Sequence, residues 1–340
     1  MKSLLFCGDL TLPFNTKVNY DEIKKLFEGN IAIANLEGSI LKVEGEVDSY
    51  RWKDKFSLYS CPEVVDLMHE LNIKAVSLCN NHILDYKHDI QETVSYLKAH
   101  GIESWGLKNH DVYKTEWEGK ALYIITFATF ANEHSLNLFS PSRVVNDVRK
   151  IRMEDPNSHI VLFPHWGREK FSYPEPADRT LAHACIDAGA DLIVGHHPHV
   201  LQPIEKYKGK DIVYSIGNFI LPEAKYGRLK SSNINAEKTE IIVEWNGEKL
   251  EIHPVYFDTS TNTVRRLDDF DINSLYKLFS APLSVSQYVR IYIAHSPLLD
   301  ILIRSRFFAT DWGERLCWLQ RMAFRKMRYI IIKLGLHKPK

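Results

Sequence analysis

Short apolar segments rich in β-branched and aromatic residues recur along the chain up to about residue 256. They are Leu4–Cys7, Ile31–Ala34, Ala75–Cys79, Leu122–Phe127, Ile160–Phe163, Leu192–Val194 and Ile212–Tyr214. Between several of them the apolar positions follow helical spacing, in Pro62–Leu71, Asp89–His100 and Asp178–Ala188. Strands that are apolar on both faces and alternate with helices are typical of an α/β domain with a largely buried sheet.

Two later segments show strict alternation instead. Thr239–Trp245 and Lys249–Tyr256 flank Asn246-Gly247, a strong β-hairpin signal. We therefore expect a second, antiparallel sheet at the end of this domain. After residue 258 the strand pattern stops, and helical spacing follows in Ser274–Phe279, Val285–Ile293 and Trp312–Leu334. This change places a boundary near residue 260, between a domain of residues 1–260 and a helical, basic extension of residues 261–340.

Composition agrees with a globular protein and excludes several other classes. The chain has 340 residues, 45% of them hydrophobic and 25% charged, which excludes collagen-like and wholly disordered chains. Its net charge of zero also argues against a nucleic-acid-binding surface. The five cysteines are scattered and never spaced as CxxC, which favours reduced thiols and a cytoplasmic location. The chain starts without a cleavable-signal pattern, and no apolar run approaches the roughly 20 residues of a membrane span.

The zero net charge is the sum of two opposite parts. Residues 301–340 carry ten Lys and Arg against two acidic residues, a charge of +8 that leaves −8 for the rest. Between Trp312 and Leu334, apolar residues recur at spacings of three and four beside the basic ones. This pattern fits a helix packed on the main domain with a solvated basic face. It also fits contact of residues 312–340 with a membrane surface or a partner.

Polar groups follow six of the predicted strands at the points where they end. They are Gly8-Asp9, Asn35-Leu36-Glu37, Asn80-Asn81-His82 with Asp85, Pro164-His165-Trp166-Gly167, Gly195-His196-His197-Pro198-His199, and Ser215-Ile216-Gly217-Asn218. In open α/β sheets the carboxyl ends of the strands line the ligand crevice, so we expect these groups to meet in one cleft. Oxygen and imidazole ligands without thiolate suit Mn, Fe or Zn. In an extended segment, His197 and His199 would point to the same side, toward one metal cluster.

The same stretches carry a family resemblance. They read GD at 8–9, ANLEGSI at 34–40, SLCNNHILDY at 77–86, PHWGREKFSYPEP at 164–176, GADLIVGHHPHVLQPIE at 189–205 and VYSIGNF at 213–219. The sequence resembles the CapA proteins of bacterial capsule and poly-γ-glutamate biosynthesis, relatives of the calcineurin-type metallophosphoesterases. The resemblance covers about residues 4–258. It implies a layered α-β-β-α fold of the metallophosphoesterase type, to which the C-terminal helical extension would be added.

The resemblance also implies a site with two divalent metal ions. Asp9 and His199 would bind the first metal, and Glu37 would bridge both. The second metal would be completed by Asn81, His165 and His197. The wider phosphoesterase group begins with Asp-x-His, whereas the third residue here is Thr11, so the first metal lacks one imidazole.

Further roles follow from the same resemblance. His82 would be the general acid or the partner of the substrate oxyanion, with its tautomer held by Asp85. The residues expected on the substrate side are Asn80, Trp166, Glu169, Tyr173, His196 and Asn218. For Trp166 and Tyr173, packing in the wall of the site is an equal alternative.

Three functions are compatible with these residues to different degrees. The first is a metal-dependent hydrolase of capsule or exopolymer metabolism, acting on a phosphoester or a γ-glutamyl amide through a metal-activated water. The second is a non-catalytic accessory protein that binds an anionic polymer beside capsule synthesis proteins. The third, a polymer-forming ligase, is disfavoured because the chain has no GxxxxGK(S/T) loop.

Overall fold

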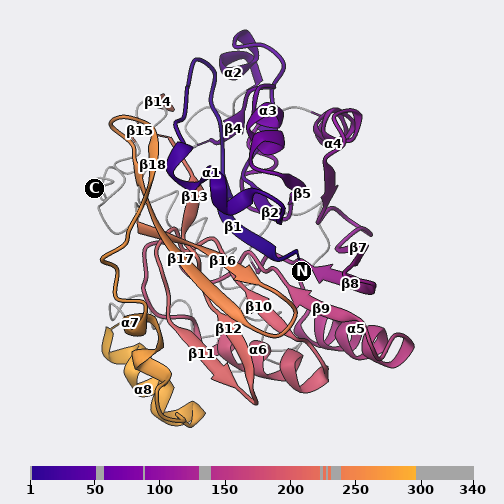
Figure 1. The fold of residues 1–340 in the computed structure, drawn as a ribbon, viewed down its shortest axis with the longest axis vertical. Helices are drawn as coiled ribbons and strands as arrows, with labels where there is room; N and C mark the ends of the chain where they lie inside the picture. Colours follow the sequence, from indigo (N-terminus) through magenta and orange to yellow (C-terminus); the bar gives the residue numbers. More distant parts are fainter. Residues whose placement is uncertain are drawn as a thin grey trace, which may run out of the picture.

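Two β-sheets pack face to face in a computed structural model of the chain, with helices on the outer face of each (Figure 1). The structure describes residues 2–50, 57–86, 89–129, 139–222, 225–226, 229–230 and 239–295. The predicted layered α-β-β-α arrangement is confirmed. All six strands that were expected to end in polar groups are present.

The first sheet has eight strands in the order β18-β17-β16-β1-β2-β5-β6, with β13 also paired to β1. Strands β1, β2, β5, β6 and β13 run parallel, and β16 to β18 are antiparallel. Their bounds are β1 Leu4–Leu10, β2 Ile31–Leu36, β5 Ile73–Ser77, β6 Glu103–Trp105, β13 Asn218–Ile220, β16 Thr239–Trp245, β17 Leu250–Asp258 and β18 Thr263–Arg266.

The second sheet has six strands in the order β11-β12-β10-β9-β8-β7. Its four inner strands are parallel, and β7 and β11 close the edges as antiparallel strands. The bounds are β7 Val112–Trp117, β8 Lys120–Ile125, β9 His159–Leu162, β10 Leu192–Val194, β11 Ile204–Tyr207 and β12 Lys210–Val213. Two short ladders stand apart from the sheets: β3 Ser39–Ile40 with β4 Tyr59–Ser60, and β14 Lys225–Tyr226 with β15 Leu229–Lys230.

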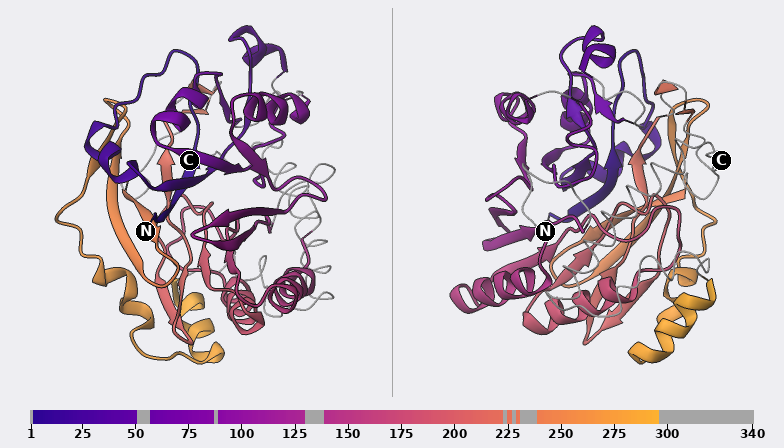
Figure 2. Two further views of the ribbon diagram at one scale, coloured as in Figure 1. Left: turned by 45° about the vertical axis from the view of Figure 1, so that its right-hand side comes forward. Right: turned by 180° about the vertical axis from the view of Figure 1, so that it is seen from behind.

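Helices cover both outer faces because each presents an apolar stripe to its sheet. The first sheet is covered by α1 Asp21–Phe27, α3 Val64–Glu70 and α4 Ile90–Ala99. The second sheet is covered by α5 Pro141–Glu154 and α6 Pro176–Ala188. The remaining helices are α2 Gly45–Tyr50, α7 Asn273–Tyr276, a 3-10 turn over Lys277–Phe279, and α8 Val285–His295. Strands β16 to β18 and the helices after them lie along one side of the molecule (Figure 2).

The hydrophobic core is divided among these layers. A central cluster between the sheets contains Phe6 of β1 and Phe163, whose rings lie 5.8 Å apart. One outer cluster joins the first sheet to α1, α3 and α4, and the other joins the second sheet to α5 and α6. These three hydrophobic clusters fix the two sheets relative to each other. They thereby also fix the strand ends that carry the polar groups.

Two expectations about the last strands need correction. The hairpin at Asn246-Gly247 is present, but β16 pairs with β1, so it extends the first sheet and does not form a second one. Strand β18 lies beyond residue 258, where the strand pattern was expected to stop. Only Val264 of that short strand is buried, which leaves too little alternation to detect. The division into domains near residue 260 stays a prediction.

The expected helices at 274–279 and 285–293 are found, whereas the one at 312–334 lies outside the described residues. Within the described ranges, no helix combines the length and the apolar character that a bilayer crossing requires. Cys7, Cys61, Cys79 and Cys185 are buried free thiols, in agreement with the prediction of reduced cysteines.

Candidate metal centre

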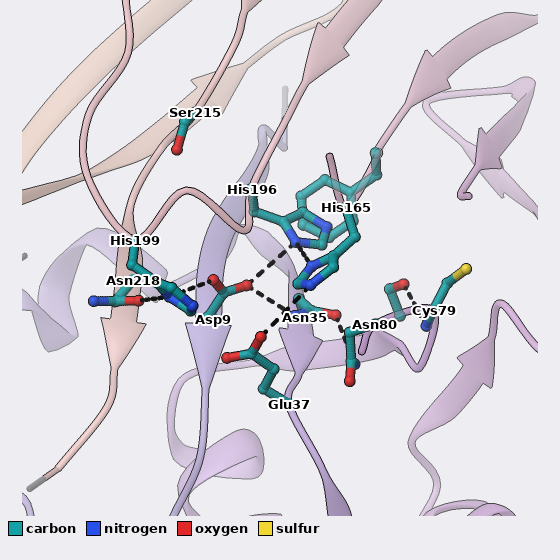
Figure 3. A network of polar contacts seen from close by, with 12 residues as sticks. Asp9, Asn35, Glu37, Cys79, Asn80, His165, His196, His199, Ser215 and Asn218 are labelled. Atoms are coloured by element: carbon teal, nitrogen blue, oxygen red, sulfur yellow. Dashed lines mark hydrogen bonds and ion pairs between the residues drawn. The ribbon is translucent and has the colours of Figure 1, made fainter. Parts of the chain in front are cut away.

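The structure brings the predicted polar strand ends together at one edge of the two sheets (Figure 3). The first sheet supplies Asp9 from β1, Glu37 after β2, and Asn81 after β5. The second sheet supplies His165 after β9 and the histidines that follow β10. The Nε2 atom of His165 lies 2.8 Å from the Oδ1 atom of Asn81, so groups from both sheets meet directly.

Asp9 lies at the centre of this group and is fully buried. Its Oδ1 atom accepts a 2.8 Å hydrogen bond from Asn35 and lies 3.2 Å from Nδ1 of His196. Its Oδ2 atom lies 3.2 Å from Nδ1 of His199. Burial by itself raises the pKa of Asp9, but the contacts with His196 and His199 outweigh it and hold the pKa well below its usual range. Asp9 is therefore a carboxylate anion at neutral pH.

Glu37 is the least satisfied carboxyl of the group. It is fully buried, and neither of its oxygens has a hydrogen-bond partner in the described part of the chain. Its Oε1 atom lies 3.6 Å from Nε2 of His165. Burial and the charge of Asp9 raise the pKa of Glu37 to about 8. A buried carboxylate without donors is costly unless a cation binds it, so its surroundings fit a metal ligand.

The three predicted histidine ligands differ in charge. Burial lowers the pKa values of His165 and His197 well below the usual range, which keeps both imidazoles neutral, the form that binds metals. Burial also tends to lower the pKa of His199, but Glu37 and Asp9 raise it to about 10, so this imidazole is protonated at neutral pH. Potential ligand atoms lie within 4.8 Å of one another in two sets: Asp9, His165 and His196, and Glu37, His197 and His199.

His197 and His199 reach the cluster by a different backbone route from the one expected. Their φ angles are 99° and 59°, so the segment is a left-handed turn and not an extended strand. Their rings still lie only 5.7 Å apart. The expected convergence is present, but the alternation argument for it was wrong. Positive φ in non-glycine residues costs free energy and is typical of functional sites.

His82 and Asp85 form the predicted pair beside this cluster. Nδ1 of His82 lies 2.5 Å from Oδ2 of Asp85, and the same oxygen accepts a 2.9 Å hydrogen bond from the backbone of Leu58. Asp85 is fully buried, whereas His82 is 8% exposed. Asp85 thus fixes a proton on Nδ1 and directs the Nε2 side of the ring away from itself.

Two of the amides expected on the substrate side, Asn80 and Asn218, are hydrogen-bonded within the cluster. Asn80 donates hydrogen bonds to Asn35 Oδ1, at 3.2 Å, and to the carbonyl of Leu36, at 2.8 Å. The Oδ1 atom of Asn218 lies 2.7 Å from Nδ1 of His199. Both amides are 1% exposed, which does not match a substrate-side position. Groups that orient metal ligands in this way commonly determine metal affinity.

His196 and Trp166 are also buried behind the ligands. Nδ1 of His196 lies 2.8 Å from Nδ1 of His165, and the indole of Trp166 donates a 2.8 Å hydrogen bond to the carbonyl of Tyr214. Of these, His196 is fully buried and Trp166 is 1% exposed, a burial that fits the alternative of wall packing for Trp166. Only Glu169 and Tyr173, on the following loop, keep exposed surface among the residues expected to face substrate.

Sequence reasoning placed Asn35 at a strand end without giving it a role, and it identified the departure at Thr11. Asn35 follows an apolar run in the same way as Glu37, and this position was the only available signal. Thr11 is fully buried, and its hydroxyl has no hydrogen-bond partner among the residues that the structure covers. A hydroxyl therefore stands where the wider phosphoesterase group has an imidazole.

Comparison with known proteins identifies the family. The model described as "Bacterial capsule synthesis protein PGA_cap" matches residues 4–223, which contain every candidate ligand. The chain belongs to this family. The predicted resemblance to CapA proteins is thereby confirmed for the greater part of the chain.

Several curated relatives carry related names. The chain is 30% identical over 201 residues to "PGA biosynthesis protein CapA" of Bacillus subtilis, covering 52% of this chain and 50% of the relative. It is 31% identical over 204 residues to "Capsule biosynthesis protein CapA" of Bacillus anthracis, covering 54% and 49%. A "Probable polyglutamine synthesis accessory protein" of Mycobacterium tuberculosis is 26% identical over 240 residues, covering 63% and 62%. The chain thus spans about half the length of the two Bacillus relatives.

Solved structures show more distant likeness. A hypothetical protein from Thermus thermophilus matches with a TM-score of 0.44 and 17% identity, covering 74% of this chain and 97% of that one. A putative 5'-nucleotidase from Staphylococcus aureus matches with a TM-score of 0.44 and 14% identity, covering 86% and 58%. Likeness at this level says nothing about the reaction.

Proposed function

We propose that this family member is a metal-dependent hydrolase of capsule or poly-γ-glutamate metabolism. The observation that carries the proposal is Glu37, a fully buried carboxyl whose two oxygens have no hydrogen-bond partner among the described residues. Its Oε1 atom lies 3.6 Å from Nε2 of His165, whose imidazole is neutral and contacts the amide oxygen of Asn81. Such a carboxyl fits a bridging ligand between two cations better than a structural role.

The donor set fits two divalent ions such as Mn, Fe or Zn. Asp9 and His199 would hold the first ion, and Asn81, His165 and His197 would hold the second, with Glu37 shared. When bound, such a pair activates water and neutralises charge on the group under attack. Thr11 offers no imidazole to the first ion, so we expect that ion to bind more weakly than the second.

The chain's own residues supply the remaining chemistry. Asp85 accepts a hydrogen bond from the Nδ1–H group of His82 and so fixes the tautomer of the ring. With a proton on both ring nitrogens, His82 would donate the one on Nε2 to the leaving oxygen or nitrogen of the substrate, as a general acid, and become the neutral ring protonated on Nδ1. Asn35 and Asn218 hold Asp9 and His199 in orientation, which limits the rearrangement required when substrate binds.

The substrate class is proposed from the family. The names of the Bacillus relatives refer to PGA and capsule biosynthesis, so we propose a phosphoester or a γ-glutamyl amide of an anionic polymer. Association with capsule synthesis proteins is proposed on the same basis. Docking of residues 312–340 on a membrane surface or a partner stays a prediction from the sequence, because those residues lie outside the described part of the chain.

The proposal is tested by metal analysis and a substrate panel. Purified protein should contain Mn, Fe or Zn, and a panel of phosphomonoesters, phosphodiesters and γ-glutamyl oligomers should include a substrate. His82→Ala should lower turnover by about 10²–10⁴-fold, as expected for loss of a general acid. His69→Ala, an exposed histidine on α3, is the matched control and should keep full activity. Turnover that is equal in wild type and His82→Ala would overturn the mechanism.

A second candidate is a non-catalytic accessory protein that binds an anionic polymer. It is favoured by one observation, the name of the mycobacterial relative, "Probable polyglutamine synthesis accessory protein". Under this alternative, wild type turns over no member of the panel but retains poly-γ-glutamate in a pull-down assay. His82→Ala would then retain the polymer equally well.

A further inference from the structure

Helix α8 contacts the loop that connects the ligand His165 to helix α6. We propose that α8 is a positioning element of the candidate site, which holds the loop of residues 167–175, and Glu169 within it, against the turn that carries His197 and His199. Helix α8 lies beyond residue 223, the last residue of the family match, so this contribution comes from the chain's own C-terminal part. The effect on substrate binding rests on the proposed function, whereas the effect on the loop does not.

Three residues of α8 contact the loop. The rings of Tyr292 and Phe171 meet edge to face, with centroids 5.3 Å apart. The hydroxyl of Tyr288 donates a 2.6 Å hydrogen bond to the carbonyl of Pro174. The rings of His295 and Tyr173 stack at 4.4 Å. Aromatic pairs of this kind contribute about 0.5–1.5 kcal/mol each beyond their buried area, so together they can hold a surface loop in place.

The opposite side of the loop contacts the turn that carries the histidine ligands. The backbone N–H of Lys170 donates a 2.7 Å hydrogen bond to the carbonyl of Pro198, which lies between His197 and His199. The side chain of Gln202 donates a 2.8 Å hydrogen bond to the carbonyl of Phe171. The loop therefore lies between α8 and the ligand turn, and displacement of either would move it.

Helix α8 is itself anchored by a buried ion pair. Arg179 of α6 pairs with Glu205 of β11, with its Nε atom 3.0 Å from Oε2. The same guanidinium lies 5.3 Å from the ring centroid of Tyr288 and donates a 3.1 Å hydrogen bond to the carbonyl of Leu283. Figure 1 shows α8 beside α6 and β11. The anchor ties α8 to the second sheet, whose strands carry the histidine ligands.

Glu169 is the exposed acidic residue that this arrangement places near the cluster. It directly precedes Lys170, whose backbone N–H bonds the carbonyl of Pro198 in the turn of His197 and His199. Its negative charge also contributes to the raised pKa values of Glu37 and His199. A carboxylate beside the site affects which charged groups of a substrate can approach. Its placement depends on the loop, and the loop is fixed by α8.

The first test measures the loop without any substrate. Trypsin cleaves after Arg168 and Lys170, and the rate of cleavage at these bonds reports local opening of the loop. In full-length protein, Tyr292→Ala should raise the rate at least about fivefold. Tyr292→Phe keeps the ring and should restore the wild-type rate. Val285→Ala, on the same helix at a side chain that is 59% exposed, is the matched control and should leave the rate unchanged.

Tryptic cleavage that is equal in wild type and folded Tyr292→Ala would overturn the proposal. If Tyr292→Ala fails to fold, Tyr288→Phe replaces it, since it removes only the hydroxyl that bonds Pro174. Opening of the loop in Tyr288→Phe supports the proposal, and a closed loop overturns it. None of these outcomes requires that the protein be a hydrolase.

The second test measures the consequence for the site. With a substrate from the panel, Tyr292→Ala should raise KM several-fold, leave kcat within about twofold, and leave the bound metal unchanged. Loop opening with an unchanged KM would overturn the positioning role while leaving the proposed hydrolase intact. If no member of the panel is turned over, the proposed function fails, and binding of poly-γ-glutamate replaces KM as the measurement.

Discussion

The Nε2 atom of His165 lies 2.8 Å from the Oδ1 atom of Asn81, and the two residues belong to opposite sheets of the sandwich. Asn81 follows β5 of the first sheet, and His165 follows β9 of the second. Under the proposed function, both would bind the same metal ion. The distance between these two residues is thus set by the packing of the two sheets, which in this way determines the geometry of the site.

Replacement of Asn81 tests this role. Asn81→Ala removes one proposed oxygen ligand, so the affinity for Mn²⁺ should fall at least about tenfold, while the fold is kept because Asn81 is half-buried. Isothermal titration calorimetry measures the change. Asn146→Ala, at an exposed position on α5, is the control. Equal Mn²⁺ affinity of wild type and Asn81→Ala would contradict the assigned ligand set.

Metal binding should depend on pH. Burial and the charge of Asp9 raise the pKa of Glu37 to about 8. Burial tends to lower the pKa of His199, but Glu37 and Asp9 outweigh it and raise this pKa to about 10. Both groups therefore carry protons at neutral pH and must release them to bind a cation. The affinity for Mn²⁺ should fall at least about tenfold for each pH unit below about 8. Titrations at pH 6, 7 and 8 test this, and a constant affinity across the series would be inconsistent with it.

The ion pair that anchors α8 should make the fold sensitive to acid. Burial by itself raises the pKa of Glu205, but hydrogen bonds from His183, Arg179 and Tyr214 lower it to about 2. A lowered pKa stabilises the folded state above the unfolded-state value of about 4.5, and this stabilisation is lost as the pH falls toward 2. The loss amounts to about 3 kcal/mol.

Glu205→Gln is the variant that isolates this contribution. It should be several kcal/mol less stable than wild type at pH 6, because the guanidinium of Arg179 loses its charged partner. The difference in the free energy of unfolding should shrink as the pH falls from 4.5 to 3, because Glu205 of unfolded wild type binds a proton in this range while the folded state keeps its charge until about pH 2. Urea denaturation at these pH values provides the measurement. A difference that stays constant with pH would exclude the ion pair as its source.

Close packing at Gly195 gives a prediction about stability. A Cβ at this position would lie 2.2 Å from Nε1 of Trp166 and 2.3 Å from the carbonyl oxygen of Tyr214. These two atoms are hydrogen-bonded to each other. Gly195→Ala should therefore lower the free energy of unfolding by about 1–3 kcal/mol or more. Gly45→Ala, where nothing lies within 4 Å of an added Cβ, is the control. Thermal unfolding measures both variants against wild type. An unfolding midpoint of Gly195→Ala equal to that of wild type would contradict the prediction and show that the structure around Trp166 can shift.

Much of the fold and the meeting of the polar strand ends at one edge could be predicted because the signals are local. Each apolar run marks a strand, and the polar residue after it marks a position at the carboxyl edge of the sheet. Asp9, Glu37 and Asn81 were placed in this way, as were the histidines. The hairpin turn at Asn246-Gly247 was equally local.

The remaining features depend on packing between distant parts of the chain. Nothing near residues 239–256 indicates that β16 pairs with β1, because that pairing joins opposite ends of the described chain. The burial of His196 behind Asp9 and the contact of Tyr292 with Phe171 depend in the same way on how the layers meet. The turn of His197 and His199 was missed because a left-handed backbone in non-glycine residues has no clear sequence signal.

Because the proposed ligands come from both sheets, metal binding under the proposed function and the folding of this protein should be thermodynamically linked. Each bound ion would join residues 9–81 of one sheet to residues 165–199 of the other. At a free metal concentration of about 100 times Kd, one such ion adds about 2.7 kcal/mol to the free energy of unfolding. In a cell short of the metal, the protein would then be less stable as well as less active. The abundance of the protein would therefore follow the metal supply.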